Sequence, residues 1–166
     1  MERNIILIGM PGSGKSTCGV LAAKALCMSF TDTDLLIQSA EEMKLQDIIN
    51  ERGTEYFEKA EERALLGVDC ESTIISTGGS AVYYDNAMKK LKENGKVIYL
   101  KVDYDEMIRR ISNMKTRGIL LKEGETMEQL FRSRESLYEK YADVTIDCSG
   151  HTVEDTVLMI CRAAAE

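Results

Sequence analysis

The chain has 166 residues, of which 44% are hydrophobic and 30% are charged, a composition that excludes disordered and fibrous proteins and favours one globular domain. Its formal net charge of -7 argues against non-specific binding to nucleic acid, which requires a basic surface. No run approaches the roughly 18 apolar residues of a membrane span, and no signal-peptide pattern opens the sequence. We therefore expect a single cytoplasmic domain over residues 1–166, monomeric, without a nucleic-acid or membrane partner.

A phosphate-binding loop follows the first apolar run. Ile5–Ile8 predicts a buried strand, and Gly9–Thr17 then matches the pattern G-x-x-x-x-G-K-[ST]. The glycines let several backbone N–H groups turn towards one anion, and the next helix adds its positive end. Lys15 is expected to reach the β- and γ-phosphates, and the Ser16 hydroxyl to hold Mg²⁺. The loop thus supplies these predicted ATP-binding residues: Gly12, Ser13, Gly14, Lys15, Ser16 and Thr17.

Apolar runs typical of strands recur along the chain and alternate with segments of helical spacing. This alternation predicts a parallel sheet covered by helices on both faces, a three-layer α/β sandwich. The Thr126 and Gln129 pair has capping-box spacing and predicts a helix that runs to about Tyr141. The five expected strands lie at 5–8, 29–32, 73–77, 97–100 and 144–146, and further helices at 20–26 and 153–161.

Two segments interrupt the simple alternation of strand and helix. Residues 34–66 have helical character without a strand, and residues 115–125 contain two glycines without a clear period. In open α/β sheets such insertions lie above the carboxyl ends of the strands, where ligands bind. We expect the first to recognise a substrate and the second to act as a lid.

Carboxylates follow the second expected strand. Asp32 is placed to orient Mg²⁺ or its waters, and Asp34 to accept a proton from a substrate hydroxyl in phosphoryl transfer. The alternative is that both side chains only cap the next helix.

Two further positions fit a ligand site. The Thr77–Ser80 turn has consecutive glycines that allow backbone to approach a ligand, and Arg117 in the lid could stabilise charge on the transferred phosphoryl group. A plain turn and a solvated arginine are the alternatives.

The thiols and the single histidine give little functional signal. Five widely spaced cysteines show no C-x-x-C pair, so a structural zinc site and a disulfide framework are both disfavoured. His151 follows the fifth strand, and exposure to solvent is its expected state.

The order of these motifs resembles the shikimate kinase family nearly end to end. The shared features are the phosphate loop, Asp32 with Asp34, Phe57 with Glu61, the glycine turn, Arg110, Arg117, and Arg134-Glu-Ser-Leu-Tyr138 before Ala142-Asp143. The resemblance implies a fold of the nucleoside-monophosphate-kinase type, with a five-stranded parallel sheet. It also implies that ATP, with Mg²⁺, phosphorylates the 3-hydroxyl of shikimate.

The resemblance assigns roles by position. Lys15, Asp34 and Arg117 would be catalytic, with Arg117 closing over ATP as the lid. Arg110 would stack on adenine, near which His151 would also fall. Asp34 would engage the reactive hydroxyls, Arg134 would bind the substrate carboxylate, and Gly78 and Gly79 would line the substrate pocket.

Four positions depart from the family pattern. Glu58 stands where the family has an arginine that shares the carboxylate, Ser80 replaces the third glycine, and Gly118 and Ser136 replace prolines. Either Glu58 turns to solvent and Arg134 alone binds shikimate, or Glu58 contacts a different acceptor, which is amine-bearing or a neutral polyol. A nucleotide-binding module without turnover is a third hypothesis.

Overall fold

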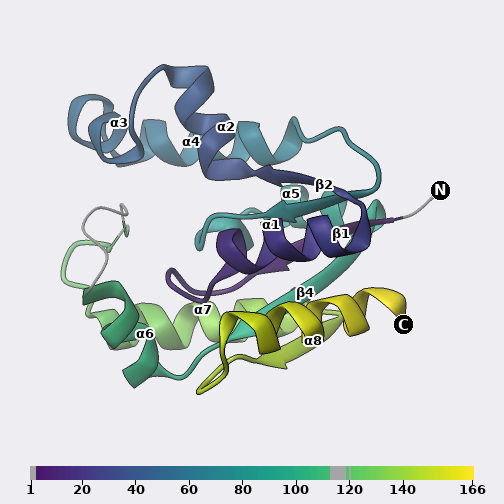
Figure 1. The fold of residues 1–166 in the computed structure, drawn as a ribbon. Helices are drawn as coiled ribbons and strands as arrows, with labels where there is room; N and C mark the ends of the chain where they lie inside the picture. The colour runs from purple at the N-terminus through teal and green to yellow at the C-terminus, as the bar shows by residue number, and fades with distance from the viewer. Residues whose placement is uncertain (1–2, 113–118, 120) are drawn as a thin grey trace.

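The computed structural model describes residues 3–112, 119 and 121–166 (Figure 1). One sheet of five parallel strands runs through it, in the order β2-β3-β1-β4-β5. The predicted parallel sheet is therefore confirmed, with strand ends that differ by at most two residues from the expected ones. The strands are β1 (Asn4–Ile8), β2 (Ser29–Asp32), β3 (Thr73–Ser76), β4 (Gly95–Lys101) and β5 (Val144–Asp147).

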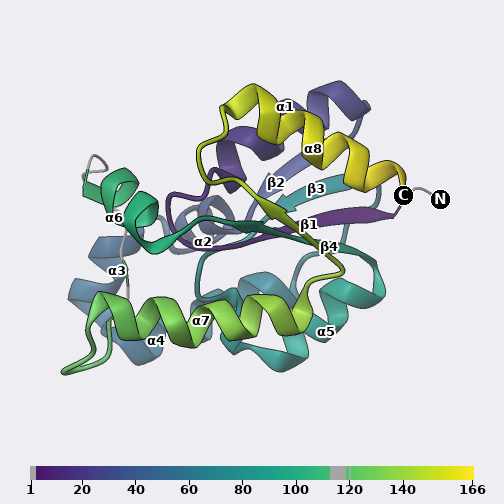
Figure 2. The same cartoon turned by 90° about the horizontal axis from the view of Figure 1, so that it is seen from below.

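Helices cover both faces of the sheet, as the three-layer expectation required (Figure 2). On one face α1 (Lys15–Leu26) packs against α8 (Val153–Ala165), and on the other lie α4 (Thr54–Leu66), α5 (Asp85–Glu93) and α7 (Met127–Tyr141). The capping box that predicted α7 is present, since the Thr126 hydroxyl accepts from the Gln129 N–H and the Gln129 side chain accepts from the Thr126 N–H. In the part of the chain that is described, no helix has the length and apolar character needed to cross a membrane.

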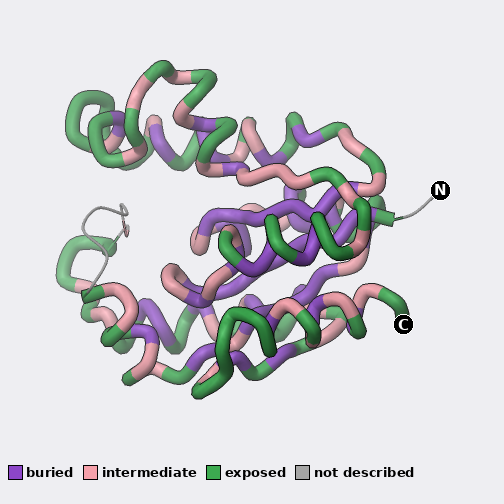
Figure 3. Tube along the Cα trace, in the orientation of Figure 1, coloured by how far each residue is buried: buried purple, intermediate pink, exposed green. Residues whose placement is uncertain are grey.

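The main core lies between these layers (Figure 3). All of β1 and residues 97–100 of β4 are buried, because the central strands of a parallel sheet are covered on both faces and carry continuous apolar runs. The edge strand β2 is only partly buried. The strands at the centre thus give the phosphate loop a rigid base.

The helical segment predicted at 34–66 consists of α2 (Thr33–Glu41), α3 (Leu45–Arg52) and α4. A small apolar cluster of its own holds the three helices together, formed by Ile37, Ile48, Phe57 and Ala60. Gly53 separates α3 from α4 and has a φ of 84°, a conformation that glycine adopts without the penalty of a Cβ. The segment lies beside the turns that follow β1 and β3, since Leu45 and Phe57 line one cavity with Pro11 and Thr77.

The connection between α6 (Tyr104–Ser112) and α7 contains the predicted lid. Residues 113–118 and 120 lie outside the described part, and residues 121–125 include a turn at Gly124 but no helix or strand. The lid therefore stays a prediction.

Candidate active site

The phosphate loop leaves β1 and enters α1 through glycines with positive φ. Gly14 is the N-cap of α1 with a φ of 94°, and a Cβ on Gly9 would lie 2.5 Å from the carbonyl oxygen of Leu100. Only 6% of Lys15 is exposed, and its ammonium donates to the carbonyl oxygens of Gly9 at 2.8 Å and Met10 at 2.9 Å. The loop therefore surrounds a cation at the positive end of a helix, which is the arrangement that binds phosphates.

Beside the loop, three side-chain oxygens from different elements meet. The Ser16 hydroxyl donates to Asp32 Oδ2 at 2.5 Å and lies 3.2 Å from the Ser76 hydroxyl. Asp32 also caps α2, because its Oδ1 accepts from the Asp34 N–H at 3.0 Å. Capping and metal orientation are thus compatible roles for Asp32.

This corner fits Mg²⁺ by its chemistry. Its donors are all oxygens, and Mg²⁺ is usually held by one or two carboxylates together with substrate phosphates and water. Within the described residues no group of three or more His, Cys, Asp or Glu side chains could hold a metal by itself. A metal at Ser16 and Asp32 would therefore depend on the nucleotide for its remaining ligands.

A cleft opens between the phosphate loop, the α2–α4 segment and α7. It is lined by residues that the sequence singled out and by several apolar neighbours: Pro11, Lys15, Ser16, Asp34, Leu45, Phe57, Glu61, Thr77, Gly78, Gly79, Ser80, Ile119 and Arg134. The structure therefore brings together Lys15, Asp34, the Thr77–Ser80 turn and Arg134, which are far apart in the sequence.

Arg134 is a buried cation at one side of this cleft. Only 2% of the residue is exposed, its Nε donates to the Tyr83 hydroxyl at 3.3 Å, and its guanidinium carbon lies 5.4 Å from the centre of the Tyr83 ring. None of the described carboxylates forms an ion pair with it. A Cβ on Gly79 would lie 2.9 Å from Arg134 Nη1, so the glycine leaves the guanidinium room at the cleft. The arrangement favours an anionic ligand.

Glu61 is a buried carboxylate in the same cleft. It is 2% exposed, and its oxygens accept from the hydroxyls of Ser80 at 2.5 Å and Tyr84 at 2.8 Å. Burial raises the pKa of the Glu61 carboxyl, while the two hydrogen bonds oppose the shift. Burial and the nearby Glu61 charge raise the pKa of Tyr84, so this phenol stays protonated and donates.

Glu58 is not placed at the cleft. It is exposed and is not one of the lining residues, whereas Phe57 and Glu61 are buried. Phe57 and Glu61 are four residues apart and share a side of α4, while Glu58 points about 100° round the helix from Phe57. The expectation that Glu58 contacts the acceptor is therefore unsupported, and the buried acid of this helix is Glu61.

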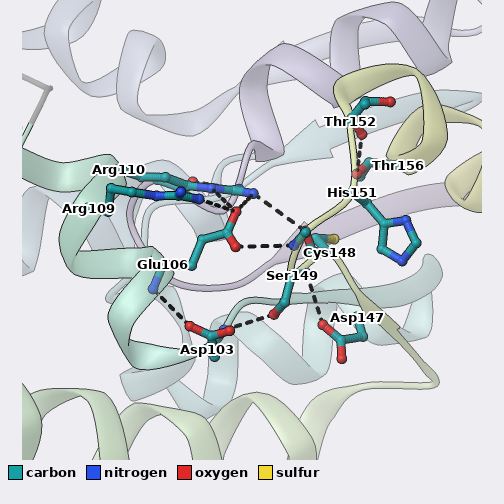
Figure 4. Close-up of polar contacts among 12 residues, drawn as sticks. Asp103, Glu106, Arg109, Arg110, Asp147, Cys148, Ser149, His151, Thr152 and Thr156 are labelled. Atoms are coloured by element: carbon teal, nitrogen blue, oxygen red, sulfur yellow. Dashed lines mark hydrogen bonds and ion pairs between the residues drawn. The ribbon is translucent and has the colours of Figure 1, made fainter.

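The side of the phosphate loop next to α6 is organised by Arg110 (Figure 4). Its guanidinium donates to Glu106 Oε1 at 2.9 Å, to the carbonyl oxygen of Gly12 at 3.2 Å and to that of Cys148 at 3.4 Å. Glu106 Oε2 in turn accepts from the Gly150 N–H at 3.1 Å. Arg110 and Glu106 therefore join the phosphate loop to the loop that follows β5.

The remaining residues considered in the sequence either do not line the cleft or lie outside the described residues. His151 is exposed, with Nδ1 4.0 Å from Asp155 Oδ2, and Thr17 is exposed on α1. All five cysteines are free thiols. Arg117 and Gly118 lie outside the described residues, and Ser136 is exposed on α7.

Substituting Glu106 tests whether its contact with Arg110 contributes to nucleotide binding. Replacing Glu106 by Gln should weaken ADP binding about tenfold, because the hydrogen bond from Arg110 then goes to a neutral amide instead of a carboxylate. Calorimetric titration with ADP measures the effect without any acceptor. Glu128→Gln is the matched control, since Glu128 pairs with Arg132 at the same spacing on the exposed side of α7. Equal ADP affinity in both variants would show that Arg110 needs no such support.

Comparison with known proteins decides the family. The model of the family described as shikimate kinase matches residues 11–165. The chain belongs to the shikimate kinase family. The family resemblance drawn from the motifs is thereby confirmed.

Individual shikimate kinases agree along almost the whole chain. One from Sulfurihydrogenibium sp. is 36% identical over 156 residues, which cover 93% of either chain. One from Clostridium botulinum, strain Okra, is 38% identical over 165 residues, covering 96% of this chain and 95% of the other. The solved shikimate kinase from Acinetobacter baumannii, in complex with shikimate, superposes with a TM-score of 0.90 at 26% identity, covering 98% and 93% of the two chains.

Sequence reasoning missed several supports of this shikimate kinase site. The Tyr83 hydroxyl accepts a hydrogen bond from Arg134, the Tyr84 hydroxyl donates to Glu61, and Glu106 accepts from Arg110. The spacing of Glu106 and Arg110, four residues apart on a helix, was a readable signal. The two tyrosines gave none, because their partners come from other helices.

Proposed function

We propose that this chain transfers the γ-phosphoryl group of ATP to the 3-hydroxyl of shikimate. The observation that carries the proposal is Arg134, a buried guanidinium without a described ion-pair partner, in the same cleft as Lys15 and Asp34. Shikimate presents a carboxylate and hydroxyls on one small ring, which matches a cation and a carboxylate facing one cavity. Family membership and the relatives' activity support the same substrate.

The donor half of the reaction uses the phosphate loop. Backbone groups of Gly12–Thr17 and the Lys15 ammonium bind the phosphates of ATP, and Arg110 stacks on its adenine base. Ser16 and Asp32 would hold Mg²⁺, which neutralises charge on the phosphates when it is bound. Since phosphoryl transfer depends mainly on positioning and charge neutralisation, this half requires no covalent intermediate with the protein.

The acceptor half uses the cleft. Arg134 binds the carboxylate, Asp34 orients the reactive hydroxyl and accepts its proton, and Gly78 and Gly79 let the ring approach the backbone. Arg117 would close over the phosphates as the lid of a single domain, with residues 34–66 on the acceptor side. The monomeric state and the cytoplasmic location also stay predictions.

A coupled assay of ADP release tests the proposal. We expect shikimate-dependent turnover, with the methyl ester of shikimate a poor acceptor because it lacks the charge that Arg134 binds. Mass spectrometry of the product should show one added phosphoryl group. ADP release that is the same with and without shikimate would overturn the proposal.

A second candidate acceptor follows from the family arginine that is missing at Glu58. With Arg134 as the one arginine among the described lining residues and two carboxylates beside it, an amine-bearing acid or a neutral polyol would also fit. The same assay with such acceptors separates the hypotheses, and turnover of any acceptor rules out a module that only binds nucleotide.

A further inference from the structure

Two departures from the family pattern come together at Glu61. Glu58 lies on the exposed side of α4, so no cation from position 58 covers the Glu61 carboxylate. At the same time Ser80, which replaces a glycine of the family, supplies a hydroxyl 2.5 Å from Glu61 Oε1. A buried carboxylate is thus held by neutral groups from the turn after β3 and the end of η1 (Ala81–Tyr83), Ser80 and Tyr84.

Neutral donors satisfy this carboxylate without cancelling its charge. A carboxylate offers about four lone-pair sites, and Ser80 and Tyr84 occupy one on each oxygen. The remaining sites are available to a ligand in the cleft that Glu61 lines. A buried carboxylate is costly when its remaining lone pairs have no hydrogen-bond donor. A ligand that donates a hydrogen bond to Glu61 is therefore favoured.

Glycines show how the charges are ordered along the cleft. A Cβ on Gly78 would lie 2.8 Å from Glu61 Oε1 and 2.9 Å from Asp34 Oδ1, and a Cβ on Gly79 would lie 2.9 Å from Arg134 Nη1. Two carboxylates therefore face one residue of the turn, and the guanidinium faces the next. A ligand that spans the turn meets acceptors at one end and a cation at the other.

We propose that Glu61 is a specificity-determining residue, which accepts a hydrogen bond from a hydroxyl or ammonium group of the acceptor while Ser80 and Tyr84 hold it in place. The inference rests on the proposed function in one respect, that the acceptor is a small hydroxylated acid bound by Arg134. Glu61 then selects for a hydrogen-bond donor opposite the carboxylate and against a second anionic group.

The test compares acceptors that differ in one group. KM is measured for shikimate, for its 4-deoxy and 5-deoxy analogues, and for analogues with an amine in place of either hydroxyl. In the unaltered enzyme we expect loss of one of these hydroxyls to raise KM about tenfold, as for a hydrogen bond to a charged group. In Glu61→Met, which is similar in length but accepts no such bond, the same change in the ligand should have less than about a twofold effect.

Ser80 and Tyr84, which donate hydrogen bonds to Glu61, are tested separately through their effects on KM. Ser80→Ala and Tyr84→Phe should each raise the KM of the acceptor about threefold and leave the KM of ATP unchanged, because each removes one neutral hydrogen bond from Glu61. Glu55→Met is the matched control for Glu61→Met, since Glu55 is on α4 with an 83% exposed side chain. A thermal melt of each variant separates loss of fold from loss of selectivity.

The outcomes distinguish this inference from the proposed function. Turnover of an amine analogue but not of shikimate, with the preference lost in Glu61→Met, would support the inference and overturn the proposed substrate. Shikimate turnover with the same penalty for each deoxy analogue in both enzymes would overturn the inference alone. Failure of every acceptor in the series to bind would overturn both.

Discussion

Replacing Asp34 by asparagine should lower kcat for the acceptor by about 10²- to 10⁴-fold, the range that a positioned general base contributes. Asp34 lines the cleft together with Lys15. The cap on α2 uses the Asp34 backbone N–H and the Asp32 side chain, so the helix start survives the substitution. An amide at position 34 can still orient a hydroxyl but cannot take its proton, so the loss falls on kcat.

Initial-rate kinetics at saturating ATP measure this effect. Asp105→Asn is the matched control, because Asp105 is likewise an acid in the first turn of a helix, α6, but is exposed and does not line the cavities that Asp34 lines; it should change kcat less than about twofold. An Asp34→Asn enzyme with a turnover number close to that of the control would refute the assigned role. A raised acceptor KM with unchanged kcat would reduce Asp34 to a binding residue.

Replacing Arg134 by glutamine should raise the KM of shikimate about thirtyfold or more, since loss of one partner of a buried, hydrogen-bonded charge pair costs about 2–5 kcal/mol. Arg134 is 2% exposed, and its guanidinium has no ion-pair partner among the described residues. The acceptor's carboxylate is therefore expected to be its principal partner. The KM of ATP should stay the same, because the phosphate loop does not depend on Arg134.

A cycle that combines the Arg134 substitution with a change in the ligand isolates the contact between the guanidinium and the acceptor's carboxylate. The methyl ester of shikimate should bind poorly to the unaltered enzyme, and Arg134→Gln should weaken it little further. Arg132→Gln serves as control, since Arg132 is on the same helix, has a 75% exposed side chain and pairs with Glu128. If shikimate and its ester lose affinity equally in Arg134→Gln, the guanidinium supports the fold of the cleft rather than the carboxylate.

The fold was largely predictable because its signals are local. Ile5–Ile8 and Val97–Leu100 are continuous apolar runs, typical of strands covered on both faces, and both are buried strands. Thr126 and Gln129 predicted the start of α7 through a contact that spans three residues. The division of residues 34–66 into three helices was not predicted, since it depends on a cluster in which Ile37 packs with Phe57.

Functional residues could be predicted from the sequence where they belong to a short motif of neighbouring residues. Lys15 and Ser16 follow from the loop pattern, and the structure places both at the cleft that Asp34 and Arg134 line. The direction of the Glu58 side chain could not be predicted in this way. Its sequence position left open whether it contacts the acceptor or turns to solvent, because the direction of a side chain on α4 depends on what packs against that helix.

The sequence alone determined the phosphate loop, the order of the strands along the chain and the shikimate kinase family, because each is encoded in short patterns or in their succession. Only the tertiary structure decided which acid of α4 lines the cleft. Glu61 is buried and Glu58 is exposed although both belong to one helix and bear the same group. Glu61 lies on the same side of α4 as the buried Phe57, and there Ser80 and Tyr84, which are far from it in the sequence, supply the hydrogen bonds that a buried carboxylate requires.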